Sequence, residues 1–484
     1  PRAGTVIGTR AICGAPRGLA YDAALDAVHV ACATGDLVTV PAAGGNELRR
    51  IRVDVDLRDV VVQQGELIVS RFRSAERLMI DPNGSIVGRS KPPLFYMAGR
   101  FEPGVAWRMQ ALPNGGTLMV HQRALLDPVP APLPPVQSYY GNAMGANAAV
   151  PDPAIAHSTV TVMRASSPTD DRVAVTPSPL VPLAGLPVDV AVSPLEDRVA
   201  IASATSGGVF EMPMSYFDTD QYTVGAGHTI IATPGQPVAV TYDAGSRLIV
   251  QTRRPAALFF VDDNTSVALG EEPRRYGAAD VAHDLFHLPA GAASGAMACA
   301  TCHPEGGDDG HKWVFTEFGE RRTASLRGGI EQTHPLHWRG ELANMGAVVD
   351  EVFMLRMGGA DPGEGHVEAL ASWVDALPSL PAPSAMSEAA ERGRILFEDT
   401  TVGCSSCHAG AMLTDNKTVD VNTGGPFQVP SLVGVAHRAP FMHNGCAATL
   451  HDRFGPCGGG DAHGRTSQLT PEQINDLVAY LETL

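Results

Sequence analysis

Apolar and polar residues alternate along much of residues 1–270, in short runs that end at turns rich in Asp, Gly, Asn and Pro. Alternation with a period of two is typical of half-buried β-strands. Five similar segments, each with an alternating strand, a turn and a more apolar strand, begin at Pro16, Leu57, Gly104, Pro187 and Pro237. Most starts lie about 40–50 residues apart, and a repeat of this length with three or four strands predicts a β-propeller.

One gap between starts, from Gly104 to Pro187, is about twice the usual repeat and indicates a further unit around residues 157–165. The terminal strands of the domain are expected to complete another unit. We therefore predict an N-terminal β-propeller of about seven blades over residues 1–274. Residues 128–155, rich in Pro, Ala and Asn, are expected to form a long surface loop. An irregular pair of β-sandwiches is the alternative.

From about residue 275 the apolar positions take the spacing of amphipathic helices. The segment Pro378–Ser384 has the composition of a semi-rigid linker and predicts two lobes, lobe 1 over residues 275–380 and lobe 2 over residues 381–484. The lobes have matching sequences, since Pro335–Gly340 corresponds to Pro440–Gly445 and both lobes close on a similar amphipathic segment. We interpret the two lobes as a duplication.

The eight cysteines divide into groups by their spacing. Four lie in two motifs, Cys299-Ala-Thr-Cys302-His303 and Cys404-Ser-Ser-Cys407-His408. C-x-x-C-H is the attachment signature of c-type haem, in which the thiols form thioethers and the histidine binds the iron. A zinc site or a thioredoxin-like redox pair is the alternative, but a zinc site needs two cysteine pairs close together. We therefore predict two covalent haem c groups and a multidomain β + α fold, in which two α-helical cytochrome c-type lobes follow the propeller.

Covalent haem attachment indicates an oxidising compartment outside the cytoplasm. There the remaining cysteines are expected to form two disulfides, Cys13 with Cys32 and Cys446 with Cys457. The chain begins at Pro1 without the regions of a signal peptide, so we expect a mature periplasmic or extracellular protein. No apolar run is long enough for a membrane span, and the net charge of −17 argues against nucleic acid as a partner.

The duplication also ranks candidates for the sixth ligand of each iron. Met357 and His463 occupy matching positions before the closing segment of each lobe, where a small cytochrome c fold presents its distal ligand. His337 and Met442 form a second matching pair, and His311 is a third option in lobe 1. For the haem of lobe 2 (haem 2) we expect His463, with Met442 as the alternative. For the haem of lobe 1 (haem 1), Met357, an open position, His311 and His337 all remain.

Residues 275–484 resemble the bacterial di-haem cytochrome c peroxidase family, which includes the MauG-like enzymes. The resemblance is carried by the first C-x-x-C-H motif with the Pro-Glu-Gly-Gly that follows it, by Arg-Arg-Thr-Ala-Ser-Leu at 321–326, by His337-Trp-Arg-Gly340, by Val429-Pro-Ser-Leu and by Arg438-Ala-Pro-Phe-Met-His-Asn-Gly445. The propeller lies outside this resemblance, although propellers of the YVTN or lactonase-like kind occur beside cytochrome domains.

The resemblance implies a division of labour between the haems. Haem 2 accepts electrons from a small donor protein and has a strong sixth ligand, a role that His463 would fill. Haem 1 is the reactive one, and Trp338 matches a tryptophan that the family places between the haems. The family also has a distal glutamate before a Met-Gly pair, but here that residue is Arg356, whose guanidinium cannot shuttle a proton. Glu351 and Glu341 are the alternative carboxylates.

Two functions follow from these expectations. The first is di-haem electron transfer with haem 1 as a peroxidase-like reactive centre. The second is pure electron transfer with both haems six-coordinate and the propeller as a docking platform for a protein or a surface. A catalytic propeller with its own cofactor is a third, which the single tryptophan of residues 1–270, Trp107, disfavours. The expected partners are a small cytochrome or cupredoxin, and the family resemblance adds a calcium ion between the lobes.

Overall fold

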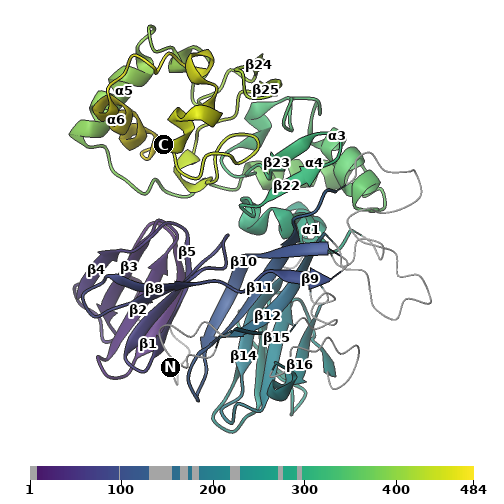
Figure 1. Ribbon diagram of the computed structural model, residues 1–484. Helices are drawn as coiled ribbons and strands as arrows, with labels where there is room; N and C mark the ends of the chain where they lie inside the picture. Colours follow the sequence, from purple (N-terminus) through teal and green to yellow (C-terminus); the bar gives the residue numbers. More distant parts are fainter. Residues whose placement is uncertain are drawn as a thin grey trace.

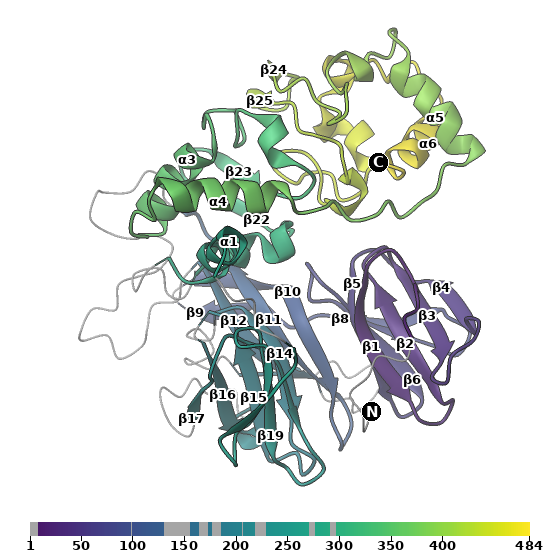
Figure 2. The same cartoon turned by 180° about the vertical axis from the view of Figure 1, so that it is seen from behind.

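The computed structural model describes residues 8–97, 99–129, 155–163, 173–176, 185–205, 207–217, 229–270, 276–290 and 297–484. In these ranges the chain forms a β-rich N-terminal part with a helical C-terminal part across one end of it (Figure 1). Lobe 1 lies over the third and fourth sheets, and lobe 2 lies on the side of the first and second (Figure 2). No helix of the described residues is both long and apolar enough to span a membrane.

Five antiparallel sheets follow one another along the N-terminal part, and in each the strands pair in chain order. The first two sheets contain β1 (Pro16–Asp22), β2 (Ala27–Cys32), β3 (Asp36–Pro41) and β4 (Arg49–Arg52), then β5 (Leu57–Gln63), β6 (Glu66–Arg71), β7 (Arg77–Ile80) and β8 (Ile86–Ser90). The third contains β9 (Phe95–Met97), β10 (Gly99–Ala111), β11 (Thr117–Leu125), β12 (Ala156–Met163) and β13 (Val173–Thr176). The last two contain β14 (Pro187–Val192), β15 (Arg198–Ser203), β16 (Gly208–Pro213) and β17 (Thr229–Ala232), then β18 (Pro237–Tyr242), β19 (Leu248–Thr252), β20 (Ala257–Phe260) and β21 (Thr265–Ala268).

The inner strands of successive sheets pack side by side, β1 on β5, β5 on β10, β10 on β14 and β14 on β18, as in the blades of a β-propeller. The described residues thus form five blades, and the prediction of about seven was wrong. The separate unit expected around residues 157–165 is not present: the described residues of this segment, 157–163, lie in β12, which pairs with β11 inside the third blade. Residues 8–15, ahead of β1, contain no strand. Most of the surface loop predicted at 128–155 lies outside the described residues.

The C-terminal part contains one arrangement twice. In lobe 1, α1 (Ala278–His287) packs against α4 (Glu364–Asp375), and in lobe 2, α5 (Glu388–Glu398) packs against α6 (Pro471–Leu481). Each lobe also has a hairpin, β22 (Lys312–Phe315) with β23 (Gly319–Arg322) and β24 (Thr418–Asp420) with β25 (Pro426–Gln428). The short helical turns are α2 (Cys299–Cys302), η3 (Pro304–Gly306), η4 (Ile330–Thr333), α3 (Met345–Val348), η5 (Val349–Arg356), η6 (Cys404–Ser406), η7 (Val435–His437), η8 (Asp452–Phe454), η9 (Pro456–Gly458) and η10 (Gly460–His463).

A turn in each lobe shows the repetition at single residues. Leu336 and Phe441 each form an isolated β-bridge across this turn. His337 and Met442, the residues that follow, both lie in the left-handed region, with φ of 78° and 70°. The pairing of these two positions from sequence spacing therefore agrees with the backbone.

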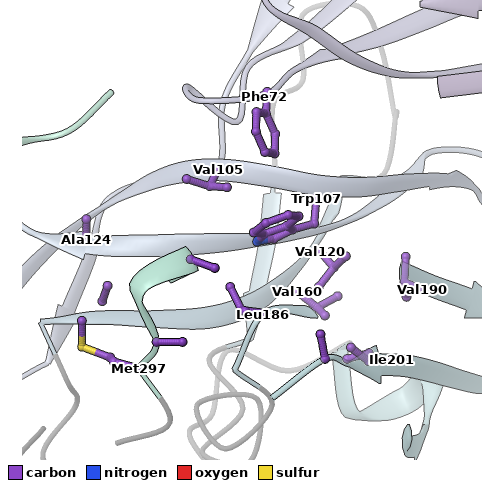
Figure 3. Close-up of a cluster of buried hydrophobic side chains, with 14 of the residues drawn as sticks. Phe72, Val105, Trp107, Val120, Ala124, Val160, Leu186, Val190, Ile201 and Met297 are labelled. Carbon is purple, nitrogen blue, oxygen red and sulfur yellow. The ribbon is translucent and has the colours of Figure 1, made fainter. Parts of the chain in front are cut away.

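The haem-attachment motif of lobe 1 packs on the core of the propeller. Met297, Ala298 and Ala300 are fully buried and belong to one apolar cluster with Trp107 and Leu186 (Figure 3). Burial of apolar surface is the main favourable term in folding. Lobe 1 and the propeller therefore share a core, whereas α5 and α6 close on a separate apolar cluster within lobe 2.

Both predicted disulfides are confirmed. Cys13 is bonded to Cys32, and Cys446 is bonded to Cys457. The four cysteines of the C-x-x-C-H motifs are not in disulfides, so their thiols are available for thioether bonds.

Candidate haem sites

Lobe 2 brings together the two histidines predicted to bind iron. The rings of His408 and His463 have centroids 6.3 Å apart and planes inclined at 37°. His408 Nδ1 donates to the carbonyl oxygen of Leu413 at 3.1 Å, and His463 Nδ1 donates to that of Gly458 at 3.1 Å. Because a carbonyl oxygen only accepts, each Nδ1 carries the proton and each Nε2 keeps its lone pair.

The separation of the two rings suits imidazoles on opposite faces of one iron. A bond between a metal and a histidine nitrogen is about 2 Å long, and the nitrogen lies about 1 Å from its ring centroid, which gives about 6 Å between centroids. Histidine ligands usually donate their second nitrogen to a carbonyl or carboxylate, which fixes the ring. The residues of lobe 2 therefore fit a haem c held by Cys404 and Cys407, with His408 and His463 as axial ligands.

The loop that carries His463 passes beside Cys404 and turns at a glycine with a positive φ. A Cβ atom on Gly464 would lie 3.6 Å from Cys404 Sγ. Gly464 also has a φ of 88°, which glycine adopts without steric cost. The Cys446–Cys457 disulfide ties the chain just ahead of this loop. The distal and proximal sides of the site are thus held in one compact unit.

The surroundings of His463 keep its ring neutral. Burial, followed by the charge of Arg453, lowers the pKa of His463 to about 3. Burial likewise lowers the pKa of His408. Arg453 also donates to the carbonyl oxygen of His463. Neutral imidazole is the form that binds a metal.

Lobe 1 repeats the proximal half of this arrangement. His303 Nδ1 donates to the carbonyl oxygen of Gly307 at 3.2 Å, which leaves Nε2 for a metal. Burial lowers the pKa of His303, so its ring is neutral as well. Cys299 and Cys302 lie on α2, directly before this histidine. The residues present again fit a covalent haem c.

His311 is not available as the sixth ligand of haem 1. Its Nδ1 lies 2.8 Å from Glu102 Oε1, and its Nε2 lies 2.9 Å from the carbonyl oxygen of Leu125. Both ring nitrogens are thus engaged by oxygen acceptors of the propeller, which leaves neither of them facing an iron.

Met357 and His337 remain as candidates for that position. Met357 is buried at the end of η5, ahead of α4, as His463 lies ahead of α6. His337 holds its Nδ1 against the carboxylate of Glu341, and its ring centroid lies 4.0 Å from that of Trp338. The geometry of lobe 2 favours Met357, because the duplication puts it at the position of His463.

Trp338 lies where the two lobes meet. Its Nε1 donates to the carbonyl oxygen of Arg322 at 3.0 Å, and its own carbonyl oxygen accepts from the backbone N of Gln428 at 3.0 Å. In the matching bond, Arg322 N donates to the carbonyl oxygen of His443 at 2.8 Å. Arg322 and Gln428 end the equivalent strands β23 and β25, so the lobes meet about a local pseudo-two-fold axis.

Stacked side chains continue this contact into lobe 2. The guanidinium carbon of Arg321 lies 5.9 Å from the ring of Trp338 and 5.0 Å from the ring of Phe427. Phe427 in turn stacks on His443, with centroids 3.7 Å apart. Cation–π and ring contacts of this kind fix the partners in place. The contact between the lobes is therefore a packed one at Trp338.

The two carboxylates predicted as proton carriers at haem 1 are each engaged by another side chain, Glu351 by Arg356 and Glu341 by His337. Arg356 donates to Glu351 Oε1 from Nη2 at 2.7 Å and from Nε at 3.2 Å. Burial alone would raise the pKa of Glu341, but His337 outweighs it and lowers that pKa to about 2. A general acid must hold and release a proton near the working pH, so Glu341 does not suit that role, and Glu351 is held in its ion pair with Arg356.

Sequence reasoning missed the ion pairs that join the propeller to the segment after His303. Arg17 Nη2 lies 3.0 Å from Glu305 Oε2, and Arg58 pairs with the other oxygen of this carboxylate. Burial alone would raise the pKa of Glu305, but Arg17 and Arg58 outweigh it and lower that pKa to about 2. Glu305 is therefore ionised and bound to the propeller.

A second pair holds the same segment three residues later. Arg73 Nη1 of the propeller lies 2.7 Å from Asp308 Oδ1, and Arg322 Nη2 lies 3.2 Å from Asp308 Oδ2. The residue before Asp308 is Gly307, whose carbonyl oxygen accepts from His303. Arginines of the propeller thus hold the loop that orients the proximal histidine of haem 1.

Replacing Glu305 by glutamine is expected to change the acid stability of the protein. The folded pKa lies below the ordinary glutamate value of about 4.3, so this group stabilises the fold fully above about pH 4.3 and loses that effect as the pH falls towards 2. The free energy of unfolding, measured with urea, should therefore fall more steeply over this pH range for the wild type than for Glu305→Gln. Glu388→Gln, at an exposed position, serves as the control and should behave as the wild type does. If the free energy of unfolding depended on pH equally in Glu305→Gln and the wild type, the stabilising ion pairs of Glu305 would be contradicted.

The described ranges contain no group of three or more His, Cys, Asp and Glu side chains arranged to hold a metal ion. The calcium ion expected from the family resemblance is therefore left without ligands that can be named.

Comparison with known proteins supports the reading of lobe 2. The family model for cytochrome c matches residues 390–484. The C-terminal lobe is therefore a cytochrome c domain, and this family implies a covalently bound haem c.

Relatives extend over more of the chain. Hydrazine synthase subunit gamma of Kuenenia stuttgartiensis is 28% identical over 266 residues, which cover 41% of this chain and 75% of that protein. Cytochrome-c peroxidase IdrP1 of Denitromonas iodatirespirans is 28% identical over 156 residues, which cover 21% of this chain and 41% of that protein. The solved structure of a MauG-like protein associated with microbial copper homeostasis is 20% identical, with a TM-score of 0.35 and coverage of 44% of this chain and 90% of its own.

Proposed function

We propose that this chain is a di-haem c-type cytochrome that takes electrons from a small redox protein at lobe 2 and passes them to lobe 1. Haem c, once bound, supplies one-electron chemistry. The residues that would hold the two groups are Cys299, Cys302 and His303 in lobe 1 and Cys404, Cys407 and His408 in lobe 2. The chain itself supplies the ligands, the contact between the lobes and the support from the propeller.

The observation that carries this proposal is the pair of histidine rings in lobe 2. His408 and His463 face each other at 6.3 Å, and each Nδ1 is tied to a carbonyl oxygen. Two protein ligands leave no iron position for a substrate, which suits electron transfer rather than ligand binding. The packed contact at Trp338 supports transfer between the lobes, because it joins them through a backbone hydrogen bond to Gln428.

The surroundings of haem 1 favour electron transfer over peroxide cleavage. The engagement of Glu351 by Arg356 and of Glu341 by His337 removes the two carboxylates proposed as proton carriers. Met357 at the position equivalent to His463 would make haem 1 six-coordinate. The similarity to a cytochrome-c peroxidase supports the alternative, in which haem 1 is open and acts as a peroxidase-like centre.

The chemistry of the chain also suggests its setting and partners. Two disulfides and two C-x-x-C-H motifs suit an oxidising compartment, such as the periplasm or the extracellular space. The net charge of −17 would attract a basic cytochrome or cupredoxin. The propeller is a further docking platform in this proposal, since it contacts lobe 1 at one end only (Figure 1).

Electron paramagnetic resonance of the haem-loaded protein tests the proposal. We expect two low-spin ferric signals in the oxidised protein, one low-spin signal after half-reduction, and no spectral change on adding hydrogen peroxide. A high-spin ferric signal that disappears with peroxide would instead support the peroxidase-like alternative. Loss of one haem in Cys404→Ser and of the other in Cys299→Ser, followed by pyridine haemochrome absorbance, would confirm the count of two.

A further inference from the structure

The buried charge of Arg123 is not balanced within the described part of the chain. Arg123 lies on β11 with its side chain fully buried, and its Nε, Nη1 and Nη2 atoms have no hydrogen-bond partner. The ring of Phe95 lies 4.6 Å from the guanidinium carbon and attracts the charge weakly. Burial lowers the pKa of Arg123 to about 9, so the group is still a cation at neutral pH. A buried cation without a counter-charge is strongly unfavourable.

Two more polar groups on the same face of the sheet also lack partners. His157 and Thr159 lie on β12, beside β11, and His157 is directly opposite Arg123. His157 Nδ1 and Thr159 Oγ1 are buried and have no hydrogen-bond partner. Buried polar groups are normally hydrogen-bonded. Three unsatisfied neighbours therefore indicate a binding partner that the described residues do not supply.

A cavity of about 160 Å³ has Arg123 in its wall. Lys91 and Ser74 of the propeller and Thr301 of lobe 1 also line it. Ser74 Oγ is another buried hydroxyl without a partner. The volume is several times that needed for one water. Its cations and unpaired donors suit a small anion rather than an apolar ligand.

The acidic residues of this wall are already engaged. Glu102 pairs with His311 Nδ1 at 2.8 Å. Asp309 accepts from the backbone N of His311 at 3.0 Å, and burial raises its pKa to about 6. Neither carboxylate forms a hydrogen bond with the Arg123 guanidinium.

A haem propionate is also poorly placed to balance Arg123. Thr301 is the spacer residue directly before Cys302, so the cavity lies on the thioether side of haem 1. The thioether bonds form at the vinyl groups, and the propionates leave the porphyrin at the opposite edge. Since no carboxylate of the described residues pairs with Arg123, the partner we consider is an anion from solution.

We propose that Arg123 anchors a binding site for a small oxoanion, a carboxylate or an inorganic one, between the propeller and the haem-attachment motif of lobe 1. The guanidinium presents a planar fork of N–H groups that matches two oxygens of such an anion. Lys91 adds a second positive charge at the cavity wall. An anion here would sit beside the motif that holds haem 1, so the site is a place where a dissolved ion could affect that centre.

Thermal unfolding of the haem-loaded full chain tests this site. Sodium acetate and sodium sulfate are titrated separately, with sodium chloride holding the ionic strength constant. A ligand that binds the folded state raises Tm in a saturable way. We expect a saturable rise in Tm for the wild type. A larger rise with acetate would assign the site to carboxylates, and a larger rise with sulfate would assign it to inorganic oxoanions. Arg123→Met should abolish the response and be at least as stable as the wild type without anion, because the uncompensated charge has gone.

Two further variants make the result decisive. Arg123→Lys keeps the charge but loses the fork, so its apparent affinity should fall by about tenfold or more. Arg100→Met removes an exposed arginine of the same sheet, paired with Asp127, and should respond as the wild type does. A wild type that shows no saturable response would overturn the proposal. So would an Arg123→Met or Arg123→Lys protein that responds as strongly as the wild type.

Discussion

Replacing His463 by glycine turns haem 2 from low-spin to high-spin and leaves haem 1 unchanged. The reason is the geometry of lobe 2, where His463 faces His408 at the separation expected of two histidines that bind one iron. Glycine removes the ligand in a loop that already contains Gly459, Gly460 and Gly464. We expect complete loss of one low-spin signal in electron paramagnetic resonance, with a shifted Soret band for half of the haem.

Met442→Leu is the matched control for this experiment. Met442 is the other candidate ligand of haem 2, and it packs at the edge of the apolar cluster of lobe 2. Leucine keeps the volume and the apolar character but cannot bind iron. The spectrum of Met442→Leu should therefore match the wild type. A change in Met442→Leu together with an unchanged His463→Gly would transfer the ligand assignment to Met442.

The haem motifs could be predicted from sequence because their chemistry depends on local spacing. A thiol, two spacers, a thiol and a histidine form one turn: α2 ends at Cys302, directly before His303, and η6 ends at Ser406, two residues before His408. The position of His463 could be predicted only by comparing the two lobes. The disulfides were also within reach, since Cys13 and Cys32 or Cys446 and Cys457 lie close along the chain.

The number of blades could not be predicted in the same way. A period in the sequence shows how often strands recur, but not which strands share a sheet. β12 alternates as a new blade would, yet it pairs with β11 across the long connection between them. Hydrogen bonding between distant strands decides such a case, and the spacing of the repeats carries no record of it.

The ion pairs at the junction were hidden for a related reason. Arg17 and Glu305 are 288 residues apart in sequence. Their pairing depends on how the propeller and lobe 1 dock. An arginine in a strand can also face solvent or pair with other groups, so its presence alone does not predict this ion pair. The one local sign was the acidic run Glu305 to Asp309 directly after the motif, where the equivalent segment of lobe 2 begins Ala-Gly-Ala-Met-Leu. This contrast makes the junction specific to haem 1.

Replacing Asp308 by asparagine should lower the free energy of unfolding by about 3–5 kcal/mol, because it breaks the buried ion pair of Arg322 and removes one of the two carboxylates that pair with Arg73, the other being Asp56. Asp308 is 4% exposed and pairs with Arg73 of the propeller and Arg322 of lobe 1. Urea unfolding of the haem-loaded chain measures the loss. Since Gly307 beside it accepts from His303, the midpoint potential of haem 1 should also shift, with that of haem 2 unchanged.

Asp415→Asn in lobe 2 provides the matched control. Asp415 follows the proximal motif of haem 2 and pairs with Lys417, whose side chain is 74% exposed. An exposed pair of this kind contributes about 1 kcal/mol or less. A loss below about 1 kcal/mol for Asp308→Asn as well would show that the junction is not a stabilising contact. If Asp308→Asn lost the expected free energy of unfolding but shifted the midpoint potentials of both haems equally, the propeller would support the C-terminal part as a whole. It would then not act specifically on the proximal loop of haem 1 through Asp308.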